Sequence, residues 1–488
     1  MASKSSRAML LFALLATALS AAGWWFGAQL DPIWWLTWLA PLPLLWLATR
    51  VRARWATLAA FVAIAIGDLP YWQYTRIGLP VSIVLPMIAM PALILALAVL
   101  LFRRLTMQRQ YLAAAFAFPV LIVAAYFING LTSINGTWGD IGYTQMDALP
   151  IIQIAALTGV AGVSFLVMLG PAFAATLCNH AASRMARLRV LGIGGGLIAL
   201  ALIYGVWRLH AAPVKSGAPM QIGLISLQGP APAPLNSAQG KQLQQRYVEA
   251  IGALSARGAQ TVVLPEKVWS TPEPDIPAFA ELARKTGVTV TTGVDYQPAN
   301  QRERNDTLTF TPVPAKPIVY VKNHLLPFLM PRFEPGHDHT MLPGTRRIGM
   351  AICKDMDFPA MGRSYAARDA QLLLVPAWDF NIDGWLHSRM AIMRGVESGF
   401  AIARAARNGR LTLSDDRGRV LAEANSSRRD AQLLGTLYLR HTHTLYARWG
   451  NWFGWLDVAA LLGLLGLTWI GRKSTNAMSN VSDADSPT

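Results

Sequence analysis

The sequence predicts a polytopic α-helical membrane domain of about eight spans and one α/β domain, which lies between the seventh span and the last. Three observations predict this arrangement. The 488 residues are 53% hydrophobic and only 14% charged, which is unusual for a soluble chain of that length. Long apolar runs fill residues 1–209 and recur at 451–472. Residues 210–450 instead alternate strand-like segments with polar helical segments, as layered α/β domains do.

The expected spans are apolar runs, each close to the roughly 20 residues that cross the hydrocarbon core of a bilayer. The first run, residues 8–22, follows Lys4 and Arg7 and has the features of a cleaved signal peptide as well. Because further apolar runs follow at once, we favour an uncleaved first helix. The other runs cover residues 33–48, 56–70, 81–102, 111–128, 157–177, 190–207 and 452–470.

Basic residues predict the orientation of these spans, because Lys and Arg are retained on the cytoplasmic side. They follow every second run, at Arg50, Arg52, Arg54, Arg103, Arg104, Arg109, Arg184, Arg187, Arg189, Arg472 and Lys473. The alternate loops carry Asp31, Asp68, Asp140 and Asp147 instead. We therefore expect both termini in the cytoplasm and residues 210–450 outside. A formal net charge of +16 would suggest nucleic-acid binding in a soluble protein. Here it reflects topology, so we expect no nucleic-acid partner.

The α/β region is expected to begin with a strand at 221–227, a helix at 239–257 and a strand at 261–264. The pattern then repeats, with further strands at 288–293, 308–311, 318–321, 347–352 and 372–376, helices at 276–285, after Pro359 and across 390–399, and paired strands near the end. Residues 473–488 are rich in Ser, Asn and Asp, which predicts a disordered cytoplasmic tail.

Three residues with reactive side chains follow predicted strands of this region. They are Glu266, Lys322 and Cys353, the last being one of only two cysteines, so no disulfide framework is implied. In layered α/β folds, ligands bind at strand ends. Each residue also has an ordinary explanation: Glu266 as a helix cap, Lys322 as a solvated lysine and Cys353 as a small core residue.

Taken in the order Glu, Lys, Cys, these residues and their neighbours resemble the catalytic triad of the nitrilase superfamily. The membrane spans narrow the resemblance to the apolipoprotein N-acyltransferase family, the membrane branch of these carbon–nitrogen hydrolases. Further segments resemble that family, and they are Trp38-Leu-Ala-Pro-Leu-Pro43, Gly142-Tyr-Thr-Gln145, Ile152-Gln-Ile-Ala155, Gly162-Val-Ser-Phe165 and Thr444-Leu-Tyr-Ala-Arg-Trp-Gly-Asn451. The resemblance covers nearly the whole chain.

The resemblance implies a four-layer α-β-β-α sandwich and a two-stage acyl transfer. A membrane phospholipid would donate a fatty acyl group to Cys353, and the thioester would acylate the N-terminal amine of a diacylglyceryl-cysteine lipoprotein precursor. Glu266 would act as general base, and Lys322 would stabilise the oxyanion together with the backbone N–H beside Cys353. The family needs no metal or dissociable cofactor. It further implies a monomer in a bacterial inner membrane, with the catalytic domain on the periplasmic face.

Several positions depart from the family pattern. Leu329 and Met330 follow Phe328 where the family has a Gly-Glu pair, and Glu334 is the nearest substitute for that glutamate. Lys354 and Asp355 stand where an aromatic residue and a glutamate are usual. Lys354 would lower the pKa of the thiol if it points inward. These departures keep open a membrane-bound amidase or hydrolase and, as a second alternative, a non-catalytic lipid-binding or lipoprotein-binding protein.

Two further patterns have competing interpretations. Trp378 and Trp385 follow the strand at 372–376, where they would form either a pocket wall or ordinary core. His337 and His339 are spaced as metal ligands sometimes are, but no further ligands accompany them at a convincing spacing. We therefore predict no metal at these histidines.

Overall fold

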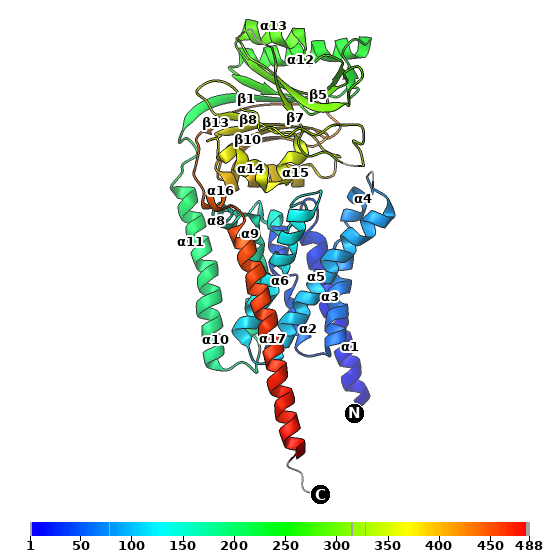
Figure 1. Ribbon diagram of the computed structural model, residues 1–488, viewed down its shortest axis with the longest axis vertical. Helices are drawn as coiled ribbons and strands as arrows, with labels where there is room; N and C mark the ends of the chain where they lie inside the picture. The colour runs from blue at the N-terminus through cyan, green and yellow to red at the C-terminus, as the bar shows by residue number, and fades with distance from the viewer. Residues whose placement is uncertain (1, 78, 314–315, 327, 485–488) are drawn as a thin grey trace.

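The computed structural model describes residues 2–77, 79–313, 316–326 and 328–484, and it consists of a helical bundle with an α/β domain on one end (Figure 1). Helix α1 begins, and helix α17 ends, at the opposite end of the bundle. The bundle is built from α1 (Ala2–Gly27), η1 (Trp34–Trp38), α2 (Leu42–Ala48), α3 (Ala53–Gly67), α4 (Tyr71–Thr75), α5 (Val81–Met107), α6 (Tyr111–Thr132), η2 (Ile141–Gln145), α7 (Leu149–Ile152), α8 (Ala155–Thr158), α9 (Val160–Leu177), α10 (Arg184–Val190), η3 (Leu191–Gly195), α11 (Gly196–His210), α16 (Leu445–Trp449) and α17 (Trp452–Ala484).

Six helical segments among the described residues are long and apolar enough to cross a membrane. They are Arg7–Gly27, Val81–Met107, Tyr111–Thr132, Val160–Leu177, Arg184–His210 and Trp452–Trp469. Large apolar side chains on their outer faces are exposed, as expected of a surface that meets lipid; Leu200, Ile203 and Trp207 of α11 are each more than 60% exposed. The helical half is therefore a membrane domain.

The runs predicted at 33–48 and 56–70 form shorter helices. The first divides into η1 and α2, because Pro41 and Pro43 cannot donate the backbone hydrogen bonds that a continuous helix needs. The second becomes α3, whose 15 residues extend about 22 Å, less than the hydrocarbon thickness. The count of about eight spans thus stays a prediction. Helix α1 packs against α3 and buries Trp24. That α1 is retained and not cleaved stays a prediction.

The C-terminal tail differs from its prediction, because α17 is helical to Ala484. Extending an existing helix needs no new nucleus, so a polar sequence can continue one that an apolar span has started. The predicted tail also includes residues 485–488, which lie outside the described residues.

The α/β domain contains two sheets packed face to face. The first has eight strands, in the order β13-β1-β3-β5-β4-β2 with β6 and β7 added beside β5, and the second has the order β12-β11-β10-β9-β8. The strands are β1 (Ala218–Ser226), β2 (Ala233–Pro234), β3 (Thr261–Val263), β4 (Trp269–Thr271), β5 (Thr289–Tyr296), β6 (Arg304–Phe310), β7 (Ile318–Val321), β8 (Ile348–Met350), β9 (Leu372–Trp378), β10 (Ala401–Arg407), β11 (Arg410–Ser414), β12 (Val420–Asn425) and β13 (Ala431–Leu439).

Helices cover the outer face of each sheet, which completes the expected α-β-β-α sandwich (Figure 1). Alternate residues of β1, such as Ile222 and Leu224, pack against Leu372 and Leu374 of β9 to form the core between the sheets. Helices α12 (Ala238–Ala256) and α13 (Pro277–Thr286) cover the first sheet. Helices α14 (Pro359–Ala366) and α15 (Gly384–Ser398) cover the second sheet and face the bundle.

Helix α15 attaches the α/β domain to the bundle. Its apolar face, including Met390 and Met393, packs with Tyr143 and Ile152 of the bundle in one buried cluster. Arg394 of α15 donates a hydrogen bond of 2.7 Å to the hydroxyl of Tyr143. The apolar cluster and this hydrogen bond together hold the α/β domain against the end of the bundle.

Candidate active site

Glu266 lies in the loop that follows β3, and its carboxylate is held by two donors. Lys322 Nζ and Asn305 Nδ2 each donate to Glu266 Oε1 at 2.6 Å. The side chains of Glu266 and Lys322 are 5% and 0% exposed. Gly293 of β5 permits this loop to lie close, because a Cβ there would stand 2.5 Å from Glu266 Cα. The carboxylate is therefore fixed in place and shielded from water.

Lys322 follows β7, and its backbone N–H donates to Asn305 O at 2.9 Å. Burial alone would lower the pKa of this ammonium group. The negative charge of Glu266, the thiol of Cys353 and the hydrogen bond to Glu266 outweigh burial, so the pKa of Lys322 is raised. Lys322 thus carries a permanent positive charge beside the sulfur at neutral pH.

Cys353 follows β8 and begins the short helix η4 (Cys353–Asp357), with a φ of +44° that non-glycine residues rarely adopt. Its Sγ lies 3.7 Å from the carbonyl oxygen of Trp378. Burial, and then the charge of Glu266, raise the pKa of the thiol to about 12, although Lys322 and Arg404 oppose the shift. The resting sulfur is accordingly a thiol, which is a weaker nucleophile than a thiolate.

Asp355 orients the Cys353 loop without lining the cavity. Its buried carboxylate accepts hydrogen bonds from Ile352 N at 2.9 Å and from the Tyr320 hydroxyl at 2.7 Å. The backbone N–H and the imidazole Nδ1 of His324, two residues after Lys322, also lie 2.9 Å from it. These contacts connect the lysine loop to the cysteine loop, so Asp355 is a positioning residue.

A cavity of about 120 Å³ opens beside Cys353, and both halves of the protein form its walls. Its apolar side chains come from the α4–α5 region, from the loop after α6 and from the loop after Lys322; they include Ile77, Leu79, Ile83, Met87, Ile134, Trp138, Leu326, Phe328 and Leu329. Lys354 also lines it and donates to Asn135 of the bundle at 2.7 Å. Burial lowers the pKa of the Lys354 ammonium group.

Only some of the other candidate residues line this cavity. Trp378 lines the cavity beside Cys353. Trp385 lies instead in the buried cluster between α15 and the bundle, where it lines a second cavity and not the one beside Cys353. Leu329, but not Met330, lines the cavity. Glu334 is exposed, and its backbone N–H donates a hydrogen bond to the carbonyl oxygen of Glu303. Pro327 lies outside the described residues.

The structure also adds residues that the sequence did not single out. Asn305 of β6 donates a hydrogen bond to Glu266, as Lys322 does. An Asn at a buried position of a strand is the sequence feature that could have pointed to it. Arg404 and Asp379 form a buried ion pair with two hydrogen bonds, of 2.5 and 2.9 Å. Arg404 lowers the pKa of Cys353, and Asp379 raises it. His387 of α15 lines the cavity, and Tyr74 of α4 lies 2.9 Å from its Nε2. That contact joins two distant segments, which no local pattern reveals.

The family comparisons agree with this division of the chain. A family model described as the apolipoprotein N-acyltransferase N-terminal domain matches residues 20–173, and the carbon–nitrogen hydrolase model matches residues 226–435. A relative named apolipoprotein N-acyltransferase from Geobacter metallireducens is 27% identical over 476 residues, which cover 87% of this chain and 89% of the relative. Another of that name, from Haemophilus ducreyi, is 24% identical and covers 91% of this chain and 94% of its own.

A solved structure of a mutant amidase of the nitrilase superfamily, from Nesterenkonia AN1, is 22% identical. It covers 46% of this chain and 94% of its own, with a TM-score of 0.40. The fold and the site define the protein as a membrane-embedded enzyme of the carbon–nitrogen hydrolase class. More specifically, the chain is similar to the apolipoprotein N-acyltransferase family, both in its N-terminal domain and over most of the length of relatives that carry this name.

Proposed function

We propose that this acyltransferase moves a fatty acyl group from a phospholipid to Cys353, and from there to the N-terminal amine of a diacylglyceryl-cysteine lipoprotein. One observation carries the proposal: Cys353, whose pKa depends on the charges of the buried Glu266–Lys322 pair, lines a cavity whose apolar wall is built partly by the membrane domain. An acyl chain bound there passes from lipid to the sulfur without crossing water.

In the first half-reaction the Cys353 sulfur attacks the ester carbonyl of the donor while Glu266 accepts the thiol proton. The ammonium group of Lys322 and the backbone N–H that follows Cys353 stabilise the oxyanion. Glu266 then returns the proton to the departing glyceryl oxygen. The products are a lysophospholipid and an acyl thioester on Cys353.

In the second half-reaction the lipoprotein amine attacks the thioester carbonyl, and Glu266 accepts the amine proton. The carbon–sulfur bond breaks, an amide forms, and Cys353 recovers its proton. The apolar wall slows hydrolysis by keeping water from the thioester. Lys354 and Asn135 provide the main polar pair in that wall, where the departing oxygen or the incoming amine needs a hydrogen-bond partner.

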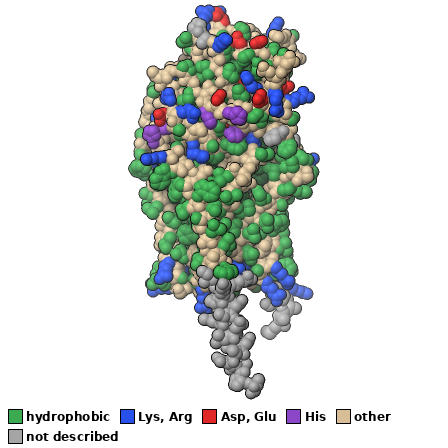
Figure 2. Space-filling model, viewed as in Figure 1, with side chains coloured by type: hydrophobic (Ala, Val, Ile, Leu, Met, Phe, Trp, Pro, Cys, Tyr) green, Lys and Arg blue, Asp and Glu red, His purple; other side chains and the backbone are tan. Residues whose placement is uncertain are grey.

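We further propose that the protein is a monomer of a bacterial inner membrane, with its α/β domain outside and both termini in the cytoplasm. The distribution of charge supports this orientation, because Lys and Arg gather at the end of the bundle farthest from the α/β domain (Figure 2). Both lipid-anchored substrates would then meet the cavity from the outer leaflet.

The test is intact-protein mass spectrometry of the purified full chain after incubation with phospholipid vesicles. We expect an added acyl mass on Cys353, discharged by a diacylglyceryl-cysteine peptide with formation of an acylated peptide. Cys178→Ala should behave as wild type and Cys353→Ala should gain no mass. Discharge at the same rate without peptide would support a hydrolase instead. No adduct under any condition would support a binding protein and overturn the proposal.

A further inference from the structure

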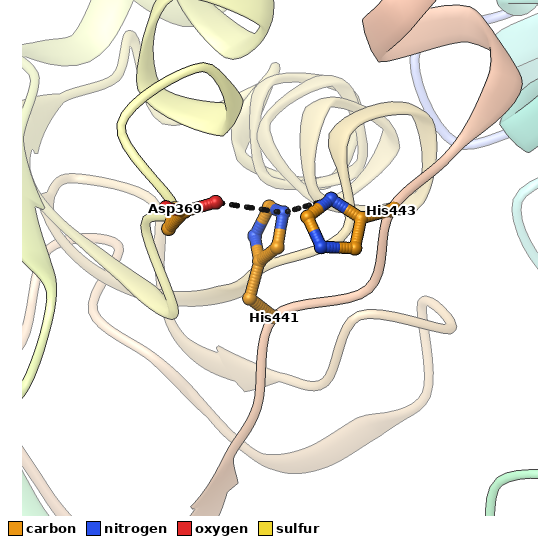
Figure 3. Close-up of side chains that lie close together, drawn as sticks. All are labelled: Asp369, His441 and His443. Atoms are coloured by element: carbon orange, nitrogen blue, oxygen red, sulfur yellow. Dashed lines mark hydrogen bonds and ion pairs between the residues drawn. The ribbon is translucent and has the colours of Figure 1, made fainter.

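Two histidines and one aspartate converge on the surface of the α/β domain, away from the cavity that holds Cys353. His441 and His443 lie in the linker between β13 and α16, and Asp369 lies in the turn between α14 and β9. One ligand atom from each of the three residues lies within 4.8 Å of the others, and no other such group occurs among the described residues. Figure 3 shows the carboxylate and both rings directed toward one another.

The distances suit a small cation. His441 Nε2 lies 3.3 Å from His443 Nδ1 and 3.8 Å from Asp369 Oδ1. A tetrahedral zinc ion with bonds of about 2.0–2.1 Å separates its ligand atoms by about 3.3–3.4 Å. The two imidazoles therefore already stand at the required separation. The carboxylate of Asp369, 3.8 Å from His441 and within 4.8 Å of His443, has to move closer to both rings to complete the site.

The linker holds the histidines in place. Thr442, between them, donates its backbone N–H to Gly399 O at 2.9 Å and its hydroxyl to Asp416 at 2.6 Å. Thr442 is thereby fixed between the two rings, of which His441 is largely buried, with its side chain 11% exposed, and His443 is exposed. These two hydrogen bonds of Thr442 order the linker without using the histidine rings.

A hydrogen bond also sets the tautomer of His441. Its Nδ1 lies 2.9 Å from the carbonyl oxygen of Ala370, which can only accept, so Nδ1 carries the proton. In the neutral form of this ring Nε2 carries the lone pair, and it lies close to His443 and Asp369. Metal-binding histidines usually have this kind of support, in which the distal nitrogen donates to a carbonyl or carboxylate.

We propose that Asp369, His441 and His443 bind a zinc-type divalent cation, with water as the fourth ligand on the exposed side. Imidazole nitrogens with one carboxylate favour zinc over magnesium or calcium, which prefer all-oxygen sites. None of the three residues lines the cavity at Cys353. The ion would connect the linker that leads to α16 with the turn after α14, so its role is structural.

The experiment uses the full chain in detergent, purified with a tag free of histidine and stripped of metal with a chelator. After equilibration with micromolar zinc and removal of the excess, mass spectrometry counts metal per chain, and thermal unfolding is measured with and without zinc. We expect about one zinc per wild-type chain, a higher midpoint of unfolding with zinc, and tetrahedral absorption bands when cobalt replaces zinc.

Two variants make the result specific. The double variant His441→Ala/His443→Ala should lose the bound zinc and the thermal shift, yet unfold like wild type in chelator. His337→Ala/His339→Ala removes another pair of histidines of the same spacing and should behave as wild type. Equal zinc in all three proteins, or less than about one-tenth of an equivalent in wild type, would show adventitious binding only and would overturn the proposal.

Discussion

The two sides of Cys353 are built from different parts of the chain. On one side, Glu266, Lys322 and Asn305 all come from the α/β domain, and their polar groups are buried and mutually hydrogen-bonded. On the other side, the cavity wall combines Lys354 and His387 with Asn135 and Tyr74 of the membrane domain. The difference teaches that the α/β domain alone supplies the buried ion pair whose charges act on Cys353, whereas the cavity depends on how the two halves meet.

The largest expected effect comes from Glu266→Gln, which keeps the shape of the side chain but removes the base. We expect the rate of thioester formation to fall by about 10³-fold, measured as acyl mass on Cys353 over time. Glu303→Gln, which changes another glutamate of the same domain, should leave the rate unchanged. A loss of less than tenfold would show that another group accepts the thiol proton.

The pH dependence of alkylation measures the raised pKa of Cys353. Because burial moves this pKa from 9.0 to about 12, the thiolate fraction should rise about tenfold per pH unit between pH 8 and 11. The rate at which iodoacetamide alkylates the Cys178→Ala variant, measured by mass spectrometry, should rise in parallel with the thiolate fraction. A plateau below pH 9 would show that the resting sulfur is a thiolate.

The same shift affects stability in a defined direction. The folded protein binds the thiol proton more tightly than the unfolded chain does, so the stabilisation is complete below pH 9 and is lost as the pH approaches 12. Cys353→Ala should remove this part of the pH dependence of the unfolding midpoint.

Lys322→Ala tests how much the buried ion pair with Glu266 contributes to stability. It leaves the buried carboxylate of Glu266 without its counter-ion, which should cost about 3–5 kcal/mol of folding free energy, seen as a lower midpoint of thermal unfolding. Lys285→Ala removes an exposed partner of Glu281 and should not change the midpoint measurably. If the two variants unfold alike, Glu266 is better hydrated than the contacts indicate.

Tyr74→Phe tests the side of the cavity shared by both halves. Losing the hydrogen bond to His387 should weaken phospholipid use by about fivefold, as a higher KM for the donor with little change in discharge by the acceptor peptide. Tyr111→Phe removes a comparable hydroxyl contact, to Ala181 O, that lies away from the cavity and serves as the control. An equal loss in both variants would indicate general loosening of the bundle.

The smallest effect is expected for Glu334→Gln. Its side chain is exposed and does not line the cavity, so acyl transfer should change by less than about twofold. A large loss would mean that the loop carrying Glu334 closes over the site during turnover.

Local patterns were sufficient for much of the architecture. The long apolar runs and the alternation of strands and helices predicted a membrane domain and an α/β domain. Three reactive residues after strands predicted that Glu266, Lys322 and Cys353 belong to one site. The structure differs from composition where packing or backbone chemistry overrides it. Prolines divide the run at 33–48, and an existing helix extends into a polar tail. Of the two interpretations left open for Trp385, the structure places it in the buried cluster at the junction.

By itself, the sequence determined the chemistry that is available: one thiol, one acid and one amine at strand ends, between segments apolar enough for a membrane. The tertiary structure alone decided which groups surround them. Asn135 meets Lys354, Tyr74 meets His387, and Asp369 meets His441 across separations of 219, 313 and 72 residues. Such contacts depend on how helices and sheets pack, and no local periodicity encodes that packing.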